Sequence, residues 1–575
     1  MKSIKGLTGA ETVLRCLRRM GVERIFASPG SEWAALWEAL AQRYAPGEIP
    51  EYLSARHEET AVAMALGYAK ATGKLPAVVI HTTVGSLHGT MAMRQALHER
   101  VPMVVLAGES IGFGEVDERD PGPQWHRVLA DIGGPARLVA PCVKWSFGIN
   151  VPEIVPDTIQ RACQIASASP RGPVFVSVPM EHLFATMTKE APAAAIPRMA
   201  HADADSIKEI AAALIAARHP VIVTEDIGES TQAVTHLVGL AERLGAPVVE
   251  AWHPSFVSFP RTHPLYAGGG RTEHVAAYLK KADFALLIDC KLPWHPPSNN
   301  PNPKCRFAAI GEDPFYQHTP YLGSPSHLVA AGSTEHTIER LAALVSRAIP
   351  ADARAAEIKR WGKLHAARRA ATLADLRASG ALDVIDTRWV AHELNALLPA
   401  DAMVINETIT HRPVLAQGLT RIEPGHYFES TLGGLGMGTG VALGVKAAFP
   451  ERPVILTIGD GSFNYNPIPG AFGVCQEHKM PILVILFDNA GYLSQKSDIA
   501  SHFPQGKAVR TKTFTGTSIA PRPNYAMLMQ AFGGYGEQVD KPAEVRAALQ
   551  RGLDAIAKGQ AALLDMRLAP INGDA

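Results

Sequence analysis

The sequence has few cysteines, and they lie far apart. No two of them are spaced as CxxC. This spacing excludes a zinc site built from CxxC pairs and offers no framework of disulfides, so we expect reduced and mostly buried thiols. The six cysteines are Cys16, Cys142, Cys163, Cys290, Cys305 and Cys475.

The chain also lacks an excess of either charge and any long apolar run. Its 55 basic residues balance 55 acidic residues, so bulk charge gives no reason to expect a nucleic-acid or anionic-membrane partner. No run reaches the length of a bilayer span, and charges interrupt the apolar residues of positions 1–26. We therefore expect a protein with no nucleic-acid or membrane partner, located in the cytoplasm.

The chain is long enough for several hydrophobic cores. Its 575 residues are several times the usual size of one domain, and 47% of them are hydrophobic while 19% are charged. These shares are typical of globular proteins. We expect two to four domains.

The first part of the chain alternates helical periodicity with short apolar runs. Such nearly continuous runs are typical of parallel strands that helices cover on both faces. The Ala- and Pro-rich segment 188–200 then indicates a linker, so we assign residues 1–188 to an N-terminal domain. Its expected strands are residues 24–27, 76–82, 102–108 and 173–179.

The same alternation occurs twice more. We assign residues 200–350 to a central domain, predict a charged helix over 353–379, and assign residues 380–575 to a C-terminal domain. The fold class is therefore α/β with three doubly wound parallel sheets, of which the first and third are candidates for structurally similar halves. The expected strands are residues 219–226, 246–251, 283–289 and 305–311 in the central domain, and 403–407, 425–430, 453–460 and 481–489 in the C-terminal domain.

Polar residues follow two of the expected strands in the third domain. The motif GDGS, with Asp460, comes directly after one apolar run, and Asn489 and Gly491 follow the next. Because the carboxyl ends of parallel strands meet at one edge, we expect these groups to share a crevice. Carboxylate, amide and backbone carbonyl oxygens suit octahedral Mg²⁺ together with diphosphate and water. Taken alone, the motif also fits a plain strand-to-helix turn.

The longer segment GDGSFNYN…ILFDNAGY resembles the cofactor-anchoring motif of thiamine-diphosphate enzymes, which begins with GDG and ends with Asn-Asn. Asp488 stands in place of the first Asn, whereas Asn489 retains the second, which is the metal ligand of that family. The resemblance implies thiamine diphosphate and Mg²⁺ as cofactors. It assigns the metal to Asp460, Asn489 and the carbonyl of Gly491.

A second segment, Arg56-His57-Glu58 followed by TAVAMALGYAKATGK, resembles the activating-glutamate region of the pyruvate decarboxylase and acetohydroxyacid synthase superfamily. The spacing to the GYA that follows favours Glu58 over its neighbour Glu59. A glutamate at this place favours the imino tautomer of the cofactor, which removes the weakly acidic thiazolium proton. We therefore expect Glu58 to be catalytic.

Two further segments resemble cofactor-binding elements of the same superfamily. Residues 432–436, LGGLG, resemble the support of the bent cofactor, with Leu435 under the ring junction, and residues 406–410 resemble a turn that donates hydrogen bonds to the diphosphate. The cofactor contacts that the resemblance implies are Thr408, Thr410, Gly434, Leu435, Gly459, Asp460, Gly461, Ser462, Asn489 and Gly491.

Within the superfamily, four segments resemble benzoylformate decarboxylases: SPGSEW, HTTVG, VKWS and SVP. The resemblance implies that Ser31 binds the substrate carboxylate and that His81 relays a proton. His295 is the nearest match to the second relay histidine of that family. With 22 histidines in the chain a chance match is common, and His295 also fits an ordinary loop residue. His57, His88 and His126 are not expected to act as catalysts.

We therefore expect non-oxidative decarboxylation of a 2-oxo acid, with a bulky or aromatic group suggested by the resemblance, to an aldehyde and CO₂. Gln495, where pyruvate decarboxylases have an acid, argues against a simple pyruvate decarboxylase. A carboligase or lyase of the benzaldehyde lyase or acetolactate synthase type is the alternative, and a nucleotide-binding protein without thiamine chemistry is the rival from another class. The resemblance implies a homodimer or homotetramer with the active site between subunits. Whether the central domain binds FAD or a nucleotide stays open.

Overall fold

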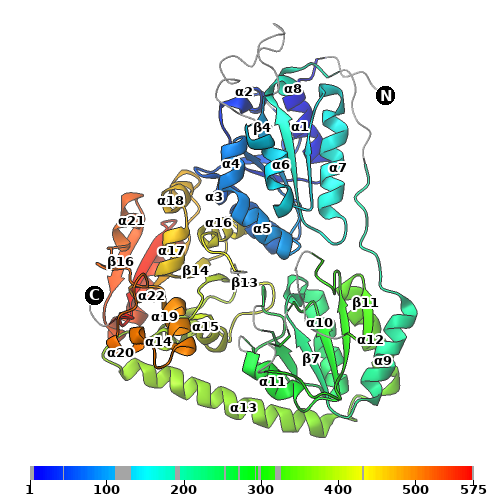
Figure 1. Cartoon of the computed structure of the whole chain (residues 1–575), viewed down its shortest axis with the longest axis vertical. Coiled ribbons are helices and arrows are strands. Elements are labelled where there is room, and N and C mark those ends of the chain that lie inside the picture. Colours follow the sequence, from blue (N-terminus) through cyan, green and yellow to red (C-terminus); the bar gives the residue numbers. More distant parts are fainter. Residues whose placement is uncertain are drawn as a thin grey trace. The chain divides into compact units, whose positions relative to one another are not determined.

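The chain forms two compact units in the computed structural model. One comprises residues 1–198, 436–450 and 466–480, and the other comprises residues 199–435, 451–465 and 481–575. Together they contain three parallel sheets flanked by helices (Figure 1). The structure describes residues 6–42, 44–110, 131–187, 194–251, 254–269, 272–291, 293–294, 299–317, 326–429 and 433–572.

The first unit contains a parallel sheet in the order β2-β1-β3-β4-β6-β5. Its four inner strands are almost wholly buried, as their continuous apolar sequences predict. The strands are β1 (Arg24–Ser28), β2 (Glu51–Ser54), β3 (Ala77–Ile80), β4 (Met103–Glu109), β5 (Trp145–Gly148) and β6 (Pro173–Pro179). The helices of this part of the chain are α1 (Gly9–Arg19), α2 (Ala34–Leu40), α3 (Glu58–Thr72), α4 (Thr83–His88), α5 (Thr90–His98), α6 (Pro135–Val139), α7 (Val155–Ser167) and α8 (Met180–Phe184).

Two helices from late in the sequence, α16 (Gly438–Ala448) and α18 (Ile468–Glu477), belong to the first unit. Helix α16 packs on α3 through glycines on both sides. A Cβ atom on Gly67 would lie 2.2 Å from the carbonyl oxygen of Val441, and one on Gly444 would lie 2.0 Å from that of Met64. The two backbones therefore approach to a distance that only glycine allows.

The second unit begins with a five-stranded parallel sheet in the order β11-β10-β9-β7-β8. The strands are β7 (Pro220–Thr224), β8 (Val248–Glu250), β9 (Phe284–Ile288), β10 (Arg306–Gly311) and β11 (Leu328–Ala331). The accompanying helices are α9 (Ala204–Ala216), α10 (Thr231–Leu244), α11 (Thr272–Leu279) and α12 (Thr334–Ala348).

The third sheet, also in the second unit, has the order β13-β12-β14-β15-β17-β16. This order repeats that of the first sheet strand for strand, which confirms that the two parts are similar halves. The strands are β12 (Met403–Glu407), β13 (Tyr427–Glu429), β14 (Val454–Gly459), β15 (Leu483–Asp488), β16 (Tyr535–Val539) and β17 (Ala562–Arg567). The remaining helices of this part are α14 (Thr387–Leu397), α15 (Arg412–Gly418), α17 (Asp460–Tyr465), α19 (Leu493–His502), α20 (Lys507–Thr511), α21 (Ala526–Ala531) and α22 (Val545–Ala557).

The predicted fold class of three parallel α/β sheets is confirmed. Each sheet lies inside one of the three predicted residue ranges, while the limits of the domains stay predictions. No helix among the described residues is long and apolar enough to cross a bilayer.

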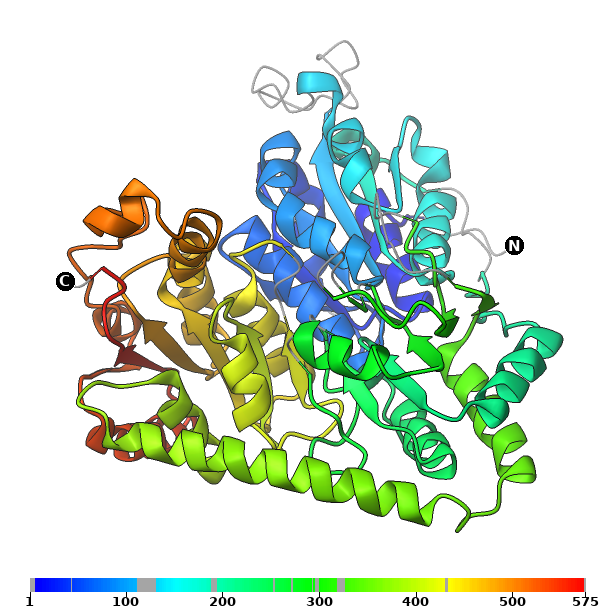
Figure 2. The ribbon, with the colours of Figure 1, turned by 60° about the horizontal axis from the view of Figure 1, so that its bottom comes forward.

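A long helix, α13 (Ala355–Ala378), joins the central and third sheets within the second unit (Figure 2). It corresponds to the charged helix that the sequence predicts. Of its side chains only His365 and Leu376 are buried. The Nδ1 atom of His365 lies 2.7 Å from the carbonyl oxygen of Pro264, and burial lowers the pKa of the imidazole to about 4. A neutral histidine therefore ties the helix to the central domain.

All six cysteines are free thiols, five of them buried and Cys142 half-buried. Burial raises the pKa of Cys163, Cys305 and Cys475 to about 12. These thiols stay protonated at neutral pH and act as small apolar side chains. The expectation of reduced, mostly buried cysteines is confirmed.

Candidate functional site

The carboxyl edge of the first sheet carries Ser31 and His81. Strands β1 and β3 are parallel neighbours that end together, with Ser28 paired to Ile80. Ser31 is exposed on a 3₁₀ turn just after β1, and His81 directly follows β3. The fully buried Trp33 donates a hydrogen bond of 2.9 Å from Nε1 to the carbonyl oxygen of Ile80. This bond fixes the turn of Ser31 against the strand of His81.

A buried carboxylate, which the sequence analysis did not identify, holds His81. The Glu32 side chain is 0% exposed, and its Oε2 lies 2.8 Å from Nδ1 of His81. A Cβ atom on Gly30 would lie 2.1 Å from that nitrogen, and one on Gly108 would lie 2.1 Å from Cγ of Glu32. The absence of a side chain at these two glycines therefore makes room for Glu32 and His81. The signal in the sequence is the acid directly after Ser31.

The Glu32 pair determines which nitrogen of His81 is available for chemistry. A carboxylate at Nδ1 keeps a proton on that atom, so Nε2 is the nitrogen that takes up or releases a proton. The hydrogen bond with Glu32 raises the pKa of His81 above its usual value. His81 is partly exposed, so the proton can be delivered to a bound molecule.

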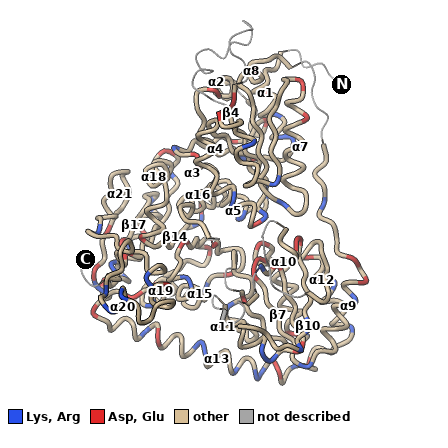
Figure 3. Tube along the Cα trace, viewed as in Figure 1, with Lys and Arg blue, Asp and Glu red and all other residues tan. Residues whose placement is uncertain are grey.

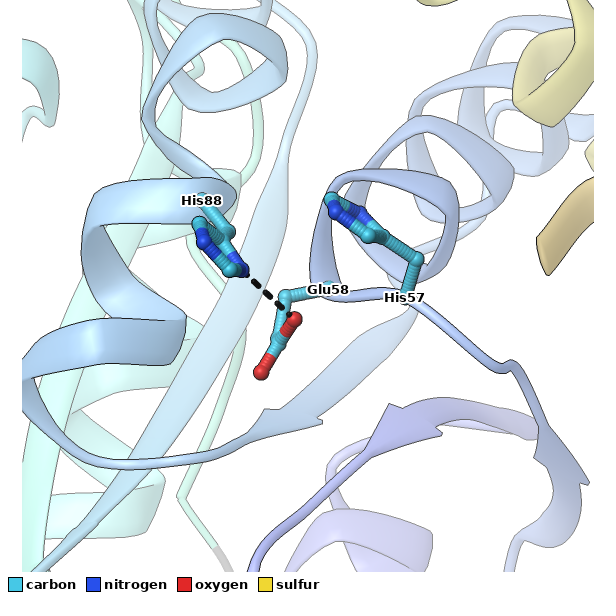
Figure 4. A group of neighbouring side chains, drawn as sticks. All are labelled: His57, Glu58 and His88. Carbon is cyan, nitrogen blue, oxygen red and sulfur yellow. Dashed lines mark hydrogen bonds and ion pairs between the residues drawn. The ribbon is translucent and has the colours of Figure 1, made fainter. Parts of the chain in front are cut away.

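Glu58 is the first residue of α3, and it lies beside two histidines, His57 and His88 (Figure 4). Its Oε2 lies 3.2 Å from Nδ1 of His88, which ends α4. Nδ1 of His57, the N-cap residue of α3, accepts a hydrogen bond from the backbone N–H of Glu59. The rings of His57 and His88 stack with centroids 5.0 Å apart. The contact between His88 and the predicted catalytic acid is new relative to the sequence analysis.

Gly85 lies close to the side chains of both Glu58 and His81. A Cβ atom at Gly85 would lie 2.9 Å from Oε1 of Glu58 and 2.9 Å from Cβ of His81. The structure thus brings three of the predicted catalytic residues, Ser31, Glu58 and His81, to one edge of the first sheet. His295 lies outside the described residues.

In the second unit, the three predicted metal-binding residues come together. Asp460 begins α17 directly after β14, and Asn489 and Gly491 follow the neighbouring strand β15. The N–H of Gly491 donates to Oδ2 of Asp460 at 2.9 Å and to Oδ1 of Asn489 at 3.1 Å. A Cβ atom at Gly491 would lie 2.2 Å from the carbonyl oxygen of Thr517, so this close turn requires glycine.

The side chain of Asp460 has the burial and the charge that are expected of a metal ligand. It is 2% exposed, and burial and then the neighbouring Asp488 raise its pKa. Among the described residues no Lys or Arg forms an ion pair with it, whereas Asp488 pairs with Arg567 at 3.0 Å. A buried acid of this kind needs a cation, and its donor set of hard oxygens fits Mg²⁺. Asp488 already has its counter-ion, which accounts for an acid where the family motif has Asn.

Asn489 is held by His411, a residue that the sequence analysis missed. Nε2 of His411 lies 3.4 Å from Nδ2 of Asn489, and its Nδ1 lies 2.9 Å from Oγ1 of Thr387. Burial lowers the pKa of His411 to about 4, so the ring is neutral and its Nε2 accepts from the amide. This contact directs Oδ1 of Asn489 away from the histidine and leaves it for a metal ion.

The other predicted cofactor contacts differ in their burial and in whether their polar groups already form hydrogen bonds. The hydroxyl of Thr408 is buried and donates to Oδ1 of Asn406 at 2.8 Å, so its proton is already used. Thr410 is half-buried just before α15. Gly434 is buried and Leu435 half-buried on the segment before α16. Gly459, Gly461 and Ser462 lie with Asp460 at the β14–α17 junction.

The carboxyl edge of the central sheet carries an ion-pair cluster. Glu225 follows β7, and its Oε2 accepts a hydrogen bond of 2.6 Å from the N–H of Lys291. Nζ of Lys291 lies 3.3 Å from Oε1 of Glu225 and also pairs with Asp226. Burial raises the pKa of Glu225. The cluster anchors the segment that leads from β9 toward Trp294.

Three family models match the chain. They are described as the N-terminal thiamine pyrophosphate-binding domain, the central domain and the C-terminal thiamine pyrophosphate-binding domain of thiamine pyrophosphate enzymes, and they match residues 7–116, 207–320 and 410–566. The chain belongs to the thiamine pyrophosphate-dependent enzymes, in the superfamily of pyruvate decarboxylase and acetohydroxyacid synthase.

Two curated relatives carry names of different reaction types. The benzoylformate decarboxylase of Pseudomonas aeruginosa is 28% identical over 83% of this chain and 85% of its own length. The acetolactate synthase large subunit of Haemophilus influenzae is 26% identical over 95% of this chain and 92% of its own length. The solved structure of a thiamine diphosphate-dependent 4-hydroxybenzoylformate decarboxylase from Rhodococcus jostii superposes with a TM-score of 0.79 at 24% identity, covering 98% of this chain and 100% of that one. The structural likeness shows the shared fold.

Proposed function

We propose that the protein decarboxylates a 2-oxo acid to an aldehyde and CO₂ with thiamine diphosphate and Mg²⁺. The observation that carries this proposal is the pair of buried Glu32 and partly exposed His81 beside Ser31, because these residues present a proton donor and a hydroxyl at one sheet edge. The proton donor serves the carbon that has lost CO₂, and the hydroxyl binds the carboxylate of the substrate before it leaves.

Thiamine diphosphate, when bound, supplies a nucleophilic carbon and a sink for the electrons that CO₂ leaves behind. We assign the metal that anchors its diphosphate to Asp460, Asn489 and the carbonyl of Gly491. Thr410, Gly434, Leu435, Gly459, Gly461 and Ser462 are the further proposed contacts, and Thr408 contributes backbone instead of its hydroxyl proton. Glu58 exchanges a proton with the aminopyrimidine ring.

The residues of the first sheet act on the substrate. Ser31 donates a hydrogen bond to the substrate carboxylate, and Nε2 of His81 delivers a proton to the carbon that has lost CO₂. Glu32 is a positioning residue that keeps His81 protonated and oriented. His295 is retained as the second proton relay. We also propose that the active unit is a homodimer or homotetramer, in which Glu58 of one copy serves the cofactor bound to Asp460 of another.

Carboligation is the second candidate function, because an acetolactate synthase large subunit matches most of the chain. The two reactions differ in whether the reacting carbon receives a proton or a second carbonyl compound. The test is a panel of aliphatic and aromatic 2-oxo acids with thiamine diphosphate and Mg²⁺, scored for CO₂, aldehyde and acyloin. Aldehyde in stoichiometric yield with CO₂ supports the decarboxylase. Acyloin or a 2-hydroxy-2-alkyl-3-oxo acid as the main product would assign the protein to the carboligases.

We expect His81→Ala to lower kcat for decarboxylation by about 10²–10⁴-fold, because it removes the proton donor. The affinity for thiamine diphosphate should stay within about 3-fold, since His81 is not among the proposed metal ligands and cofactor contacts. The fraction of acyloin should rise relative to aldehyde, because slower protonation of the reacting carbon leaves more time for an aldehyde to add to it. Steady-state kinetics, cofactor titration and product analysis on one variant measure all three. A joint loss of thermal stability and cofactor, with the product ratio unchanged, would make His81 a packing residue.

We expect Glu32→Gln to lower kcat at pH 7.5 by roughly 10–100-fold, as loss of the carboxylate behind a catalytic histidine does. His81 must be protonated to act, so activity falls as the pH rises through its pKa. Glu32 raises that pKa, and the variant should therefore lose activity at a lower pH than the wild type. Glu109→Gln, a carboxylate on the same sheet edge that binds Ser177, is the matched control and should leave the pH profile in place. An unshifted profile in Glu32→Gln would remove Glu32 from the mechanism.

A further inference from the structure

The second unit contains a pocket of about 460 Å³ that shares no described lining residue with the proposed active site. It lies between the segment that follows β8, helix α13, helix α14 and the end of α15. The described lining residues are Arg261, Thr262, Tyr266, Gly268, Gly269, His274, Arg368, Arg369, Thr372, Leu373, Leu376, His392, Asn395, Ala416, Gln417, Gly418 and Thr420.

Two arginines on α13 face this pocket without a carboxylate partner among the described residues. The guanidinium of Arg368 donates to the hydroxyl of Tyr278 and to the carbonyl oxygen of Tyr266, both at 3.4 Å. Arg369 donates to the carbonyl oxygen of Thr262. Neutral acceptors therefore hold the two side chains in place and leave their positive charges unbalanced. Figure 3 marks the basic residues along α13.

A third cation lies deeper in the wall. Arg261 is 2% exposed, and its Nη1 donates to the carbonyl oxygen of Leu419 at 3.0 Å. Its Nε is 3.8 Å from Oε2 of Glu250, and its Nη2 has no hydrogen-bond partner among the described residues. Glu250, which also accepts a hydrogen bond of 3.0 Å from Tyr266, is its counter-ion. Burial lowers the pKa of Arg261, but the negative charge of Glu250 outweighs burial and raises it, so the charge of this arginine is already compensated.

The remaining polar lining completes a site for an anion. Among the described residues no Asp or Glu lines the pocket, while hydroxyl, amide and imidazole groups do. Arginine guanidinium groups bind phosphate and carboxylate oxygens in pairs, with bonds about twice as strong as those between neutral groups. The other polar lining groups that can add hydrogen bonds are Thr372, Asn395, Thr420, His274 and His392.

We propose that this pocket binds a small dianion, with Arg368 and Arg369 as the residues that hold its oxyanion groups. A phosphate ester and a dicarboxylate both fit this description, because each carries two negative charges on a compact molecule. The pocket volume suits a ligand of metabolite size. The lining of this pocket includes neither Glu58 nor the proposed metal ligands, so the anion site is distinct from the proposed active site.

The test uses the full-length holoenzyme saturated with thiamine diphosphate and Mg²⁺, so that the cofactor site cannot take up the probe. Inorganic phosphate and malonate are titrated separately by calorimetry, with chloride at matched ionic strength as the blank. We expect saturable binding of at least one probe, and the tighter one identifies the ligand as a phosphate or a dicarboxylate. Signals no larger than those of chloride for both probes would overturn the proposal.

Variants then locate the bound anion. R368Q/R369Q should raise the Kd of the probe by at least about 10-fold, since the double variant removes both charge-assisted contacts to the anion. Arg377→Gln, an exposed arginine of the same helix that does not line the pocket, is the matched control and should leave the Kd unchanged. Should the double variant fail to fold, Arg369→Gln alone is expected to raise the Kd several-fold. An unchanged Kd in a folded variant would place the anion elsewhere and refute the site.

Discussion

Replacing Glu58 by Gln is expected to slow exchange of the thiazolium proton of bound thiamine diphosphate, and kcat with it, by about 10²–10⁴-fold. Glutamine keeps the size of the side chain but cannot share a proton with the aminopyrimidine ring. The fold should persist, because the side chain begins α3 and is not part of its hydrophobic face. Hydrogen–deuterium exchange on the bound cofactor, followed by NMR after acid quench, measures the step directly.

Glu59→Gln provides the matched control for this prediction. Glu59 is the adjacent acid on the same turn, but its N–H binds His57 and it is buried in the first unit. Cofactor exchange in Glu59→Gln should stay within about 5-fold of the wild type once any loss of thermal stability is accounted for. Fast exchange in Glu58→Gln together with slow exchange in Glu59→Gln would transfer the role to the neighbour.

Replacing Asp460 by Ala is expected to weaken Mg²⁺-dependent binding of thiamine diphosphate by more than about 100-fold. The substitution removes the only charged protein ligand in the proposed coordination shell. Calorimetric titration of the apoenzyme with cofactor, with and without Mg²⁺, measures the loss. An unchanged affinity would place the metal elsewhere.

Asp488→Asn is the informative control, because it restores the Asn-Asn ending of the family motif. It should keep cofactor affinity within about 3-fold while lowering thermal stability, since Arg567 then loses a buried partner at 3.0 Å.

The affinity of the wild-type protein for Mg²⁺ should also depend on pH. The raised pKa of Asp460 means that Mg²⁺ affinity falls as the pH falls through that pKa, because the metal must displace a proton.

The sequence predicted most of the inner strands and the edge strands β8 and β13, but it missed the edge strands β2, β5, β11 and β16. Strands β1, β3, β4 and β6 are continuous apolar runs because both faces are covered. Edge strands β5 and β16 are half-exposed and mix polar with apolar residues, so no run reveals them. The inner strand β17 was also missed, because Asp565 and Arg567 interrupt it. These two pair with each other at 3.1 Å inside the fold, a partnership invisible in the sequence.

The sequence by itself determined the family, the three-sheet fold and the candidate groups Glu58, His81 and Asp460, because short motifs at strand ends specify both turn geometry and chemistry. Only the tertiary structure shows which side chains contact these candidate groups. Glu32 reaches His81 from the turn after β1, His88 reaches Glu58 from another helix, and His411 reaches Asn489 from the segment between β12 and α15. Nor does the sequence reveal that α16 packs on α3 in the first unit. Motif spacing is local, whereas burial, protonation and partner choice depend on residues that only folding brings together.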